Sequence, residues 1–185
     1  MQPAQKKAAP EKQSENLTST RVTLPAVSQI VFRSVLSHFS SGITIVTTCD
    51  NGHFHGLTVS SFCSLSLEPP LVLICIDHRC QSYVLIEKTR IFAVNILAEN
   101  GGWLAHQFAH RERERFINVA TYVGLTGAPM LKDALATMEC QVCDILPSGD
   151  HSIIVGRVVD ANVNDKASPL LYYRSEFYQL GGKKS

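Results

Sequence analysis

Short runs of apolar and β-branched residues, separated by turn-forming residues, recur along most of the chain and predict a protein built mainly of strands. The valine, isoleucine and threonine in these runs are typical of buried strands. Strands are expected at residues 43–49, from about 54, and at 71–76, 91–97, 136–146, 153–162, 170–173 and 177–180.

The residues between these runs indicate how the strands are connected. The Asp-Asn-Gly sequence at 50–52 is a strong tight-turn signal, so the strands beside it should form an antiparallel hairpin. Turns are also expected at 147–150 and 174–176. The prolines at 69–70 are expected to break the sheet, because proline cannot donate a ladder hydrogen bond. Residues 126–129 are expected to be irregular.

Helical spacing is found in few places. Apolar residues at 30, 31, 35, 36 and 39 lie near one face of an amphipathic helix expected over 26–39, which the Ser-Ser-Gly sequence after it should end. Shorter helices are expected at 82–88 and 102–108. The alternating arginines and glutamates of 111–115 indicate a charged loop or helix end. A solvated face is the default interpretation of this run, and a lid over a bound cofactor is the alternative.

This arrangement predicts a mainly β fold, a closed or nearly closed antiparallel barrel with a few flanking helices. A doubly wound parallel sheet is disfavoured, because the strands far outnumber the helices that could serve as crossovers. Residues 1–24 are polar and carry almost no bulky apolar side chain, so they are expected to be a disordered tail before a domain at 25–182. A transit peptide is the weaker interpretation, because Glu11 and Glu15 are acidic.

Composition narrows the possible partners and the compartment. The chain has 185 residues, 45% of them hydrophobic and 18% charged, with a net charge of +1, which suits one globular domain. With so small a net charge, neither nucleic acid nor a membrane surface is expected as a partner. The N-terminus lacks the apolar core of a secretory signal, so the six cysteines are expected to be reduced and the protein cytoplasmic.

Several common chemical motifs are absent or incomplete. The sequence has no GxGxxG opening a helix, no GxxxxGK[ST] loop and no HExxH. His53 and His55 share one face of an expected strand, but no third ligand is evident, so no metal site is expected. Cys140 and Cys143 spell CxxC on an expected strand, where their side chains point to opposite faces and favour packing over redox chemistry.

Two stretches could bind a ligand. Residues 55–77 combine serines, threonines and a glycine with an apolar run, and backbone N–H groups beside hydroxyls can cradle a phosphate. Taken alone, the composition favours an ordinary strand with exposed serines. Residues 149–151, Gly-Asp-His, suit a turn equally well as a loop rim where His151 could donate to a ligand.

Ordered matches to one known family strengthen the binding interpretation. Residues 32–36 (FRSVL) and 41–48 (SGITIVTT) resemble the opening of the flavin reductase family. Residues 55–62 (HGLTVSSF) and 64–72 (SLSLEPPLV) resemble its next two segments. Further segments match in family order at 90–97, 126–129, 139–140, 149–151, 156–158 and 169–174.

The resemblance implies an FMN-binding split β-barrel, antiparallel and Greek-key-like, that forms a homodimer. It also implies an NAD(P)H-dependent flavin reductase, which reduces FMN or FAD and supplies reduced flavin to a partner monooxygenase. NADH is favoured over NADPH, because no arginine pair for a 2′-phosphate lies near Gly149. The alternative is an electron-transfer protein of the same fold that holds flavin without oxidising NAD(P)H.

The resemblance also implies roles for individual residues. His151 is the expected catalytic residue, positioning the nicotinamide with Tyr173 beside it. The expected cofactor-binding residues are His55, Gly56, Leu57, Thr58, Val59, Ser60, Ser61, Cys75, Ile76, Asp77, Gln81, Ser82, Asn95, Gly149, Asp150, His151 and Tyr173.

Overall fold

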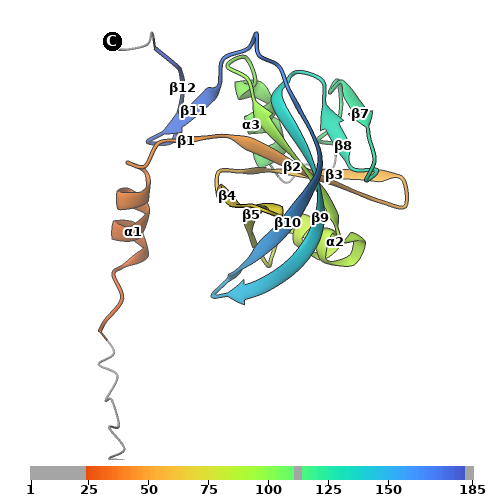
Figure 1. The fold of residues 1–185 in the computed structure, drawn as a ribbon. Coiled ribbons are helices and arrows are strands. Elements are labelled where there is room, and N and C mark those ends of the chain that lie inside the picture. The colour runs from red at the N-terminus through yellow and green to blue at the C-terminus, as the bar shows by residue number, and fades with distance from the viewer. Residues whose placement is uncertain (1–23, 111–113, 182–185) are drawn as a thin grey trace, which may run out of the picture.

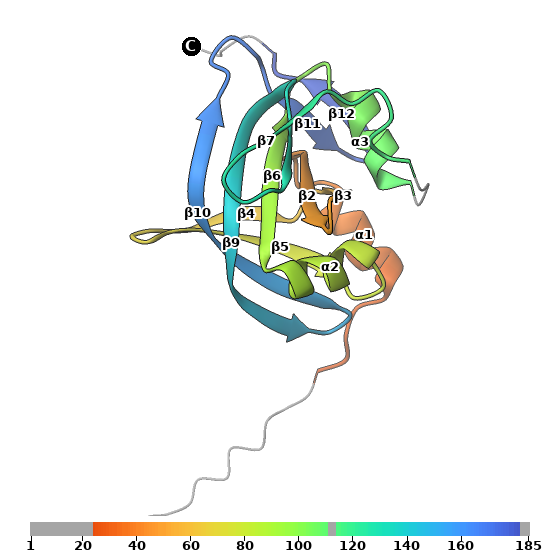
Figure 2. The same ribbon diagram turned by 90° about the vertical axis from the view of Figure 1, so that its right-hand side faces the viewer.

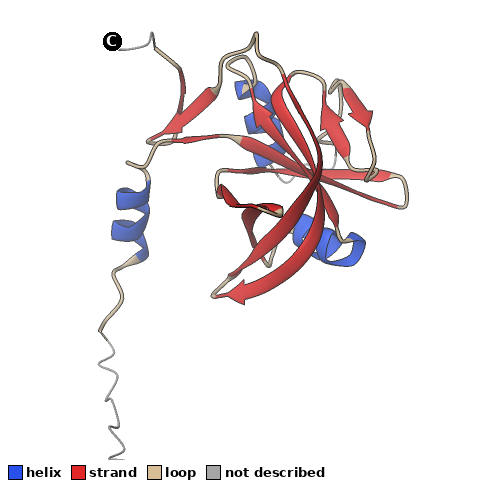
Figure 3. Ribbon diagram, viewed as in Figure 1, coloured by secondary structure: helices blue, strands red, loops and turns tan. Residues whose placement is uncertain are grey.

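A single curled antiparallel sheet dominates the structure, a computed structural model that describes residues 24–110 and 114–181. Figure 1 shows the strands wrapped around a common core, and Figure 3 shows how few helices accompany them. The helices are α1 (Gln29–Leu36), α2 (Gln81–Thr89) and α3 (Gly102–Ala109). The strands are β1 (Ser41–Gly42), β2 (Thr44–Asp50), β3 (His53–Val59), β4 (Phe62–Leu67), β5 (Pro70–Asp77), β6 (Ile91–Leu97), β7 (Thr121–Val123), β8 (Pro129–Leu131), β9 (Ala134–Ser148), β10 (His151–Val163), β11 (Leu170–Tyr173) and β12 (Glu176–Gln179).

Seven strands form the main sheet in the order β3-β2-β6-β9-β10-β5-β4, with every neighbouring pair antiparallel. Strands β11 and β12 join β1 in a second sheet, and β7 and β8 pair in a third. The mainly β, antiparallel prediction is therefore confirmed. In Figure 2 the main sheet curls so that β3 and β4, its two edge strands, approach from opposite sides.

The core lies inside this curl and follows from the alternation of the strands. On β5, Val72, Ile74 and Ile76 are buried, while the residues between them are only partly covered. They pack in one cluster with Phe92 of β6 and Ile154 of β10, both fully buried. Inward-facing apolar positions with a period of two are what one strand contributes to such a core.

The predicted hairpins at 50–52 and 147–150 are present, but the turn of the second is shorter than expected. Asn51 and Gly52, both with positive φ, form a two-residue turn between β2 and β3, as the sequence indicated. The turn between β9 and β10 contains only Gly149 and Asp150, because Pro147 and Ser148 still pair with β10.

One further prediction was wrong. Pro69 and Pro70 do not break the sheet, because β4 and β5 form a hairpin in which Leu67 lies opposite Pro70. Proline is tolerated there because it is the first residue of its strand. The irregular stretch expected at 126–129 is confirmed for 126–128, which lie in no helix or strand, while Pro129 begins β8 and pairs with Val123.

Helix α1 stands apart from the rest of the molecule (Figure 1). None of its residues is buried, and Ile30, Phe32 and Val35 are 82%, 54% and 66% exposed. An isolated helix of this length is marginal in water, and the described residues of the chain leave its apolar face uncovered.

Some predictions fall on residues that the structure does not describe. The expected tail lies almost wholly within 1–23, and most of the charged run lies within 111–113, both outside the described residues. Among the residues that are described, no helix has the length and apolar character needed to cross a membrane.

Candidate functional site

A cleft of about 830 Å³ follows β3, an edge strand of the main sheet. Its volume lies within the range of small-molecule sites. One wall is the start of α2, and the other is the end of α3 with the segment after it. The lining residues are Asp50, Asn51, His53, Phe54, His55, Gly56, Leu57, Thr58, Arg79, Cys80, Gln81, Ser82, Leu85, Phe108, Ala109, Arg115 and Phe116.

Strand β3 offers backbone groups to this cleft because it pairs with β2 on one side only. The guanidinium of Arg115 donates to the Gly56 carbonyl, so the backbone groups of Gly56 face away from β2. In an antiparallel ladder this direction alternates, so the groups of Phe54 and Thr58 also face outward. Leu57 then directs its backbone groups toward β2. Among the residues expected to offer backbone to a flavin, Thr58 therefore has the suitable direction.

Close contacts fix β3 against α3. The Thr58 hydroxyl donates to the Ala105 carbonyl at 2.7 Å. A Cβ added at Gly56 would lie 2.7 Å from Cε1 of Phe108, so glycine is needed for this approach. Phe116 packs edge-on against Phe108, with ring centroids 5.0 Å apart, and closes this wall.

The N-terminus of α2 points its first turn at the cleft. Cys80 is the N-cap but makes no side-chain capping bond, while Gln81 and Ser82 begin the helix and line the cleft. The first N–H groups of a helix have no partner within the helix, and they attract anions. Ser82 is buried and lines the cleft.

The charged groups around the cleft differ in their pairing. Arg79 donates from Nε and Nη2 to both carboxylate oxygens of Asp77, the shortest distance being 2.6 Å. This hydrogen bond holds the pKa of Asp77 well below its usual range. Burial lowers the pKa of Arg115 and is also the main cause of the lowered pKa of His55.

The structure brings only part of the expected site into this cleft. The expected residues that line it are His55, Gly56, Leu57, Thr58, Gln81 and Ser82.

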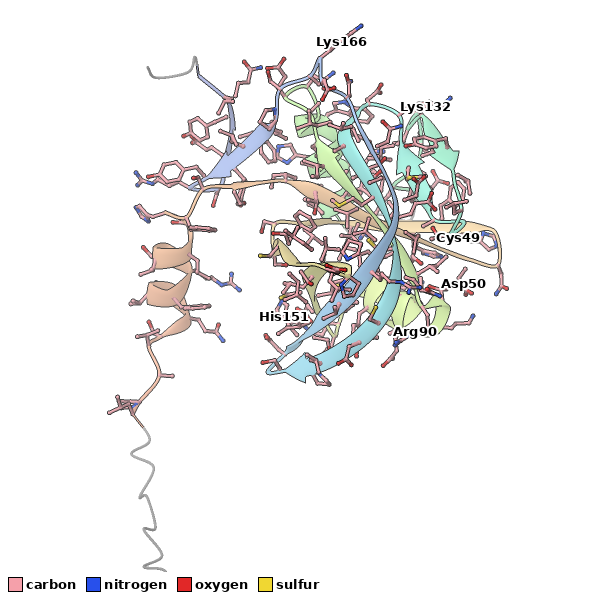
Figure 4. All side chains as sticks on the ribbon, in the orientation of Figure 1. Cys49, Asp50, Arg90, Lys132, His151 and Lys166 are labelled. Atoms are coloured by element: carbon pink, nitrogen blue, oxygen red, sulfur yellow. The ribbon has the colours of Figure 1, made fainter. Side chains whose placement is uncertain are left out.

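A second group of expected residues gathers at the neighbouring ends of β5 and β10. His151 lies opposite Asp77 in the ladder, and Asp77 binds Arg79, which lines the cleft. Nδ1 of His151 lies 2.7 Å from Oδ1 of Asp150, and this hydrogen bond is the main cause of the lowered pKa of Asp150. Figure 4 shows His151 near the end of β10 that adjoins Gly149.

The remaining expected residues near β4 and β5 take part in the sheet. The Ser61 hydroxyl donates to the Cys75 carbonyl at 2.8 Å, and Ser60 is exposed beside it. Ile76 and Val59 are buried core residues, 1% and 5% exposed.

Two expected residues lie elsewhere in the single chain. Asn95 is fully buried, where its amide donates to the Ile45 carbonyl and accepts from the Leu131 N–H, so it supports the sheet. Tyr173 belongs to the β1-β11-β12 sheet and packs against His38 and Tyr178. Figures 1 and 2 place that sheet at the opposite end of the molecule from the β9–β10 turn, so Tyr173 does not lie beside His151 within one chain.

Sequence reasoning did not identify the aromatic and basic residues of the cleft. Phe54 and Phe116 contact each other at a centroid distance of 5.7 Å, although they are far apart in sequence. Arg115 bonds the Gly56 carbonyl of β3, 59 residues away in sequence. Arg79 had a usable signal, because a basic residue directly before a helix start is well placed to meet an anion.

The cysteines and histidines show no metal chemistry in the described chain. Within residues 24–110 and 114–181, no three histidine, cysteine or acidic side chains gather so as to hold a metal ion. All six cysteines are free thiols. Cys140 is buried and Cys143 exposed, and Cys143 falls at an irregularity of the β9–β10 ladder.

Comparisons with known proteins define the class of this barrel and cleft. Residues 36–181 match the model of the flavin reductase like domain, so the chain belongs to the flavin reductase family, and its fold is the split barrel. It is 42% identical over 146 residues to the reductase component of 4-nitrophenol 4-monooxygenase/4-nitrocatechol 2-monooxygenase from Rhodococcus opacus, covering 79% of this chain and 78% of that protein.

Two further relatives support this assignment. An NADH-dependent flavin reductase from a Rhodococcus species is 36% identical over 159 residues, with 84% of this chain and 89% of that protein covered. A solved structure of the NADH:FAD oxidoreductase from Streptomyces globisporus, in complex with NAD and FAD fragments, has a TM-score of 0.81 and 30% identity. The match covers 85% of this chain and 95% of that one.

Proposed function

We propose that the protein is an NAD(P)H:flavin oxidoreductase, which reduces FMN or FAD and releases reduced flavin to a partner monooxygenase. The observation that carries the proposal is the cleft along β3 in a chain of the flavin reductase family. The cleft combines outward backbone groups of an edge strand with the uncapped start of α2 and an arginine. This donor set suits a flavin, which needs hydrogen bonds along its ring edge and a cationic or N–H environment for its phosphate.

In this proposal the chain binds and orients the two nucleotides, and the bound flavin supplies the hydride-accepting chemistry. Thr58 offers its backbone to the ring, while Gln81 and Ser82 lie at the phosphate. His151 orients the nicotinamide at the rim, because it stands on the ladder beside Asp77, whose partner Arg79 enters the cleft. Holding two reactants in one cleft removes much of the entropic cost of their encounter.

Reductase activity is tested by mixing the purified protein with NADH or NADPH and with riboflavin, FMN or FAD. We expect rapid loss of the reduced-nicotinamide absorbance that depends on added flavin, with NADH preferred to NADPH. A protein that stays yellow and leaves NADH unchanged would be a flavin-holding electron carrier, contradicting the proposal. The six combinations also show which flavin the cleft accepts.

A homodimer is the second part of the proposal, and helix α1 supports it. The apolar side chains of α1 are exposed in the single chain, and packing against a second copy would bury them. We expect light scattering after size-exclusion chromatography to show a dimer, and Val35→Asp to shift the protein toward monomer. Leu125→Asp is the control, because Leu125 is 77% exposed on a loop away from α1. A wild-type monomer, or a Val35→Asp variant that remains dimeric, would contradict this use of α1.

A further inference from the structure

Arg115 is anchored at both its backbone and its side chain. Its carbonyl accepts from Nε2 of Gln107 at 2.7 Å, which fixes the segment after α3. Its Nε donates to the His110 carbonyl at 2.8 Å, and Nη1 donates to the Gly56 carbonyl on β3. The guanidinium is thus held across the edge of β3 and lines the cleft.

The two arginines of the cleft differ in whether a neighbouring carboxylate neutralises their charge. Arg79 is bound by both carboxylate oxygens of Asp77, so its charge is largely neutralised. Among residues 24–110 and 114–181, no carboxylate forms an ion pair with Arg115, and its hydrogen-bond acceptors there are neutral carbonyls. Within the described part of the chain, Arg115 therefore has no carboxylate partner, in contrast to Arg79.

The surroundings of Arg115 favour an anion. Its side chain is partly buried, and burial lowers its pKa because the charge has lost part of its hydration. An anion in the cleft would restore that lost stabilisation. Nη2 has no acceptor among the described residues and remains available to a bound group. Guanidinium groups bind phosphate oxygens through parallel hydrogen bonds, which adds geometric specificity.

The start of α2 stands near enough to share the same anion. Cys80, the N-cap of α2, lines the same cleft as Arg115. Ser82 and the first N–H groups of α2 also face the cleft. An anion held here would be contacted from two sides, by Arg115 and by α2.

We propose that Arg115 is the residue that recognises the phosphate of the flavin nucleotide, and that Arg79 has at most a minor part in this. The inference rests on the proposed function and deepens it. It assigns the discrimination between FMN and riboflavin to one side chain. The phosphates of the nicotinamide nucleotide are the other source of the same chemistry, and the experiment separates the two.

The test compares Arg115→Gln, Arg115→Lys and Arg79→Gln with the wild type, using FMN and riboflavin. Binding is measured by flavin fluorescence titration and turnover by NADH oxidation. In Arg115→Gln we expect the Kd and KM for FMN to rise about ten-fold or more, with riboflavin values changed less than about two-fold. Arg115→Lys should lie between, because it keeps the charge and loses the planar fork. Arg79→Gln should raise the FMN values less than about three-fold.

Arg157→Gln is the matched control, because Arg157 is exposed on β10, bonds the side chain of Gln141 and does not line the cleft. The inference is overturned if Arg115→Gln binds FMN as the wild type does, or if it weakens riboflavin and FMN equally. An effect on the KM for NADH alone would assign the charge to the nicotinamide nucleotide and also overturn it. Because titration needs no turnover, a wild type that binds FMN without oxidising NADH refutes the proposed reductase and still tests Arg115.

Discussion

Replacing Gly156 with alanine is expected to lower the free energy of unfolding by about 3 kcal/mol, at the upper end of the usual cost of overpacking a core. Gly156 lies on β10, where an added Cβ would overlap Cζ of Phe92 and lie 2.6 Å from its Cε1 and 3.0 Å from Cβ of Cys140. Phe92 is fully buried at the centre of the main core cluster, so it has no open space to move into. The measurement is urea unfolding followed by circular dichroism.

Gly42→Ala is the matched control for this prediction. Nothing lies within 4 Å of a Cβ added at Gly42, so its stability should change by less than about 0.5 kcal/mol. Adding Phe92→Leu to Gly156→Ala removes the overlapping ring atoms and should restore part of the loss. If Gly156→Ala unfolds at the wild-type urea concentration, the contact with Phe92 is looser than the structure shows.

The elements of this fold were predictable where a local pattern determines them. A two-residue hairpin turn needs positive φ at both positions, which Asn-Gly favours, and Asn51 and Gly52 both have positive φ in the structure. Strand β6 was predicted at its observed bounds, Ile91–Leu97, because it is a continuous apolar run with clear ends. Short strands such as β7 and β8 were not predicted, because three residues carry too little periodicity to be distinguished from a loop.

The candidate site was less predictable, because it depends on which strand becomes an edge and which segment folds back. Asn95 looked like a polar residue available to a ligand, yet its amide is used in full to bond the backbone of Ile45 and Leu131. Arg115 looked like one charge in a solvated run, yet it reaches the backbone of Gly56. The bonds from Asn95 to Ile45 and Leu131 and from Arg115 to Gly56 each join residues at least 36 positions apart in sequence, and no local pattern encodes them.

Replacing Glu139 with glutamine is expected to lower the free energy of unfolding by about 2–3 kcal/mol, because hydrogen bonds to a carboxylate contribute about 1.5–3 kcal/mol each. Glu139 is fully buried on β9. Its carboxylate accepts from the N–H groups of Leu125 and Thr126 at 2.9 and 2.6 Å, and from the Thr126 hydroxyl at 2.7 Å. A glutamine amide nitrogen cannot accept, so at least one of these donors would face another N–H group.

The comparison that decides this prediction is between Glu139→Gln and Glu176→Gln, measured by the same urea unfolding. Glu176 is exposed and bonds only the Tyr178 hydroxyl among the described residues, so its change should cost less than about 0.5 kcal/mol. The loop that Glu139 holds does not line the cleft, so the folded Glu139→Gln protein should keep the wild-type Kd for FMN. Equal stability of the two variants would contradict the prediction and show that the hydrogen bonds from Leu125 and Thr126 to Glu139 contribute little to stability.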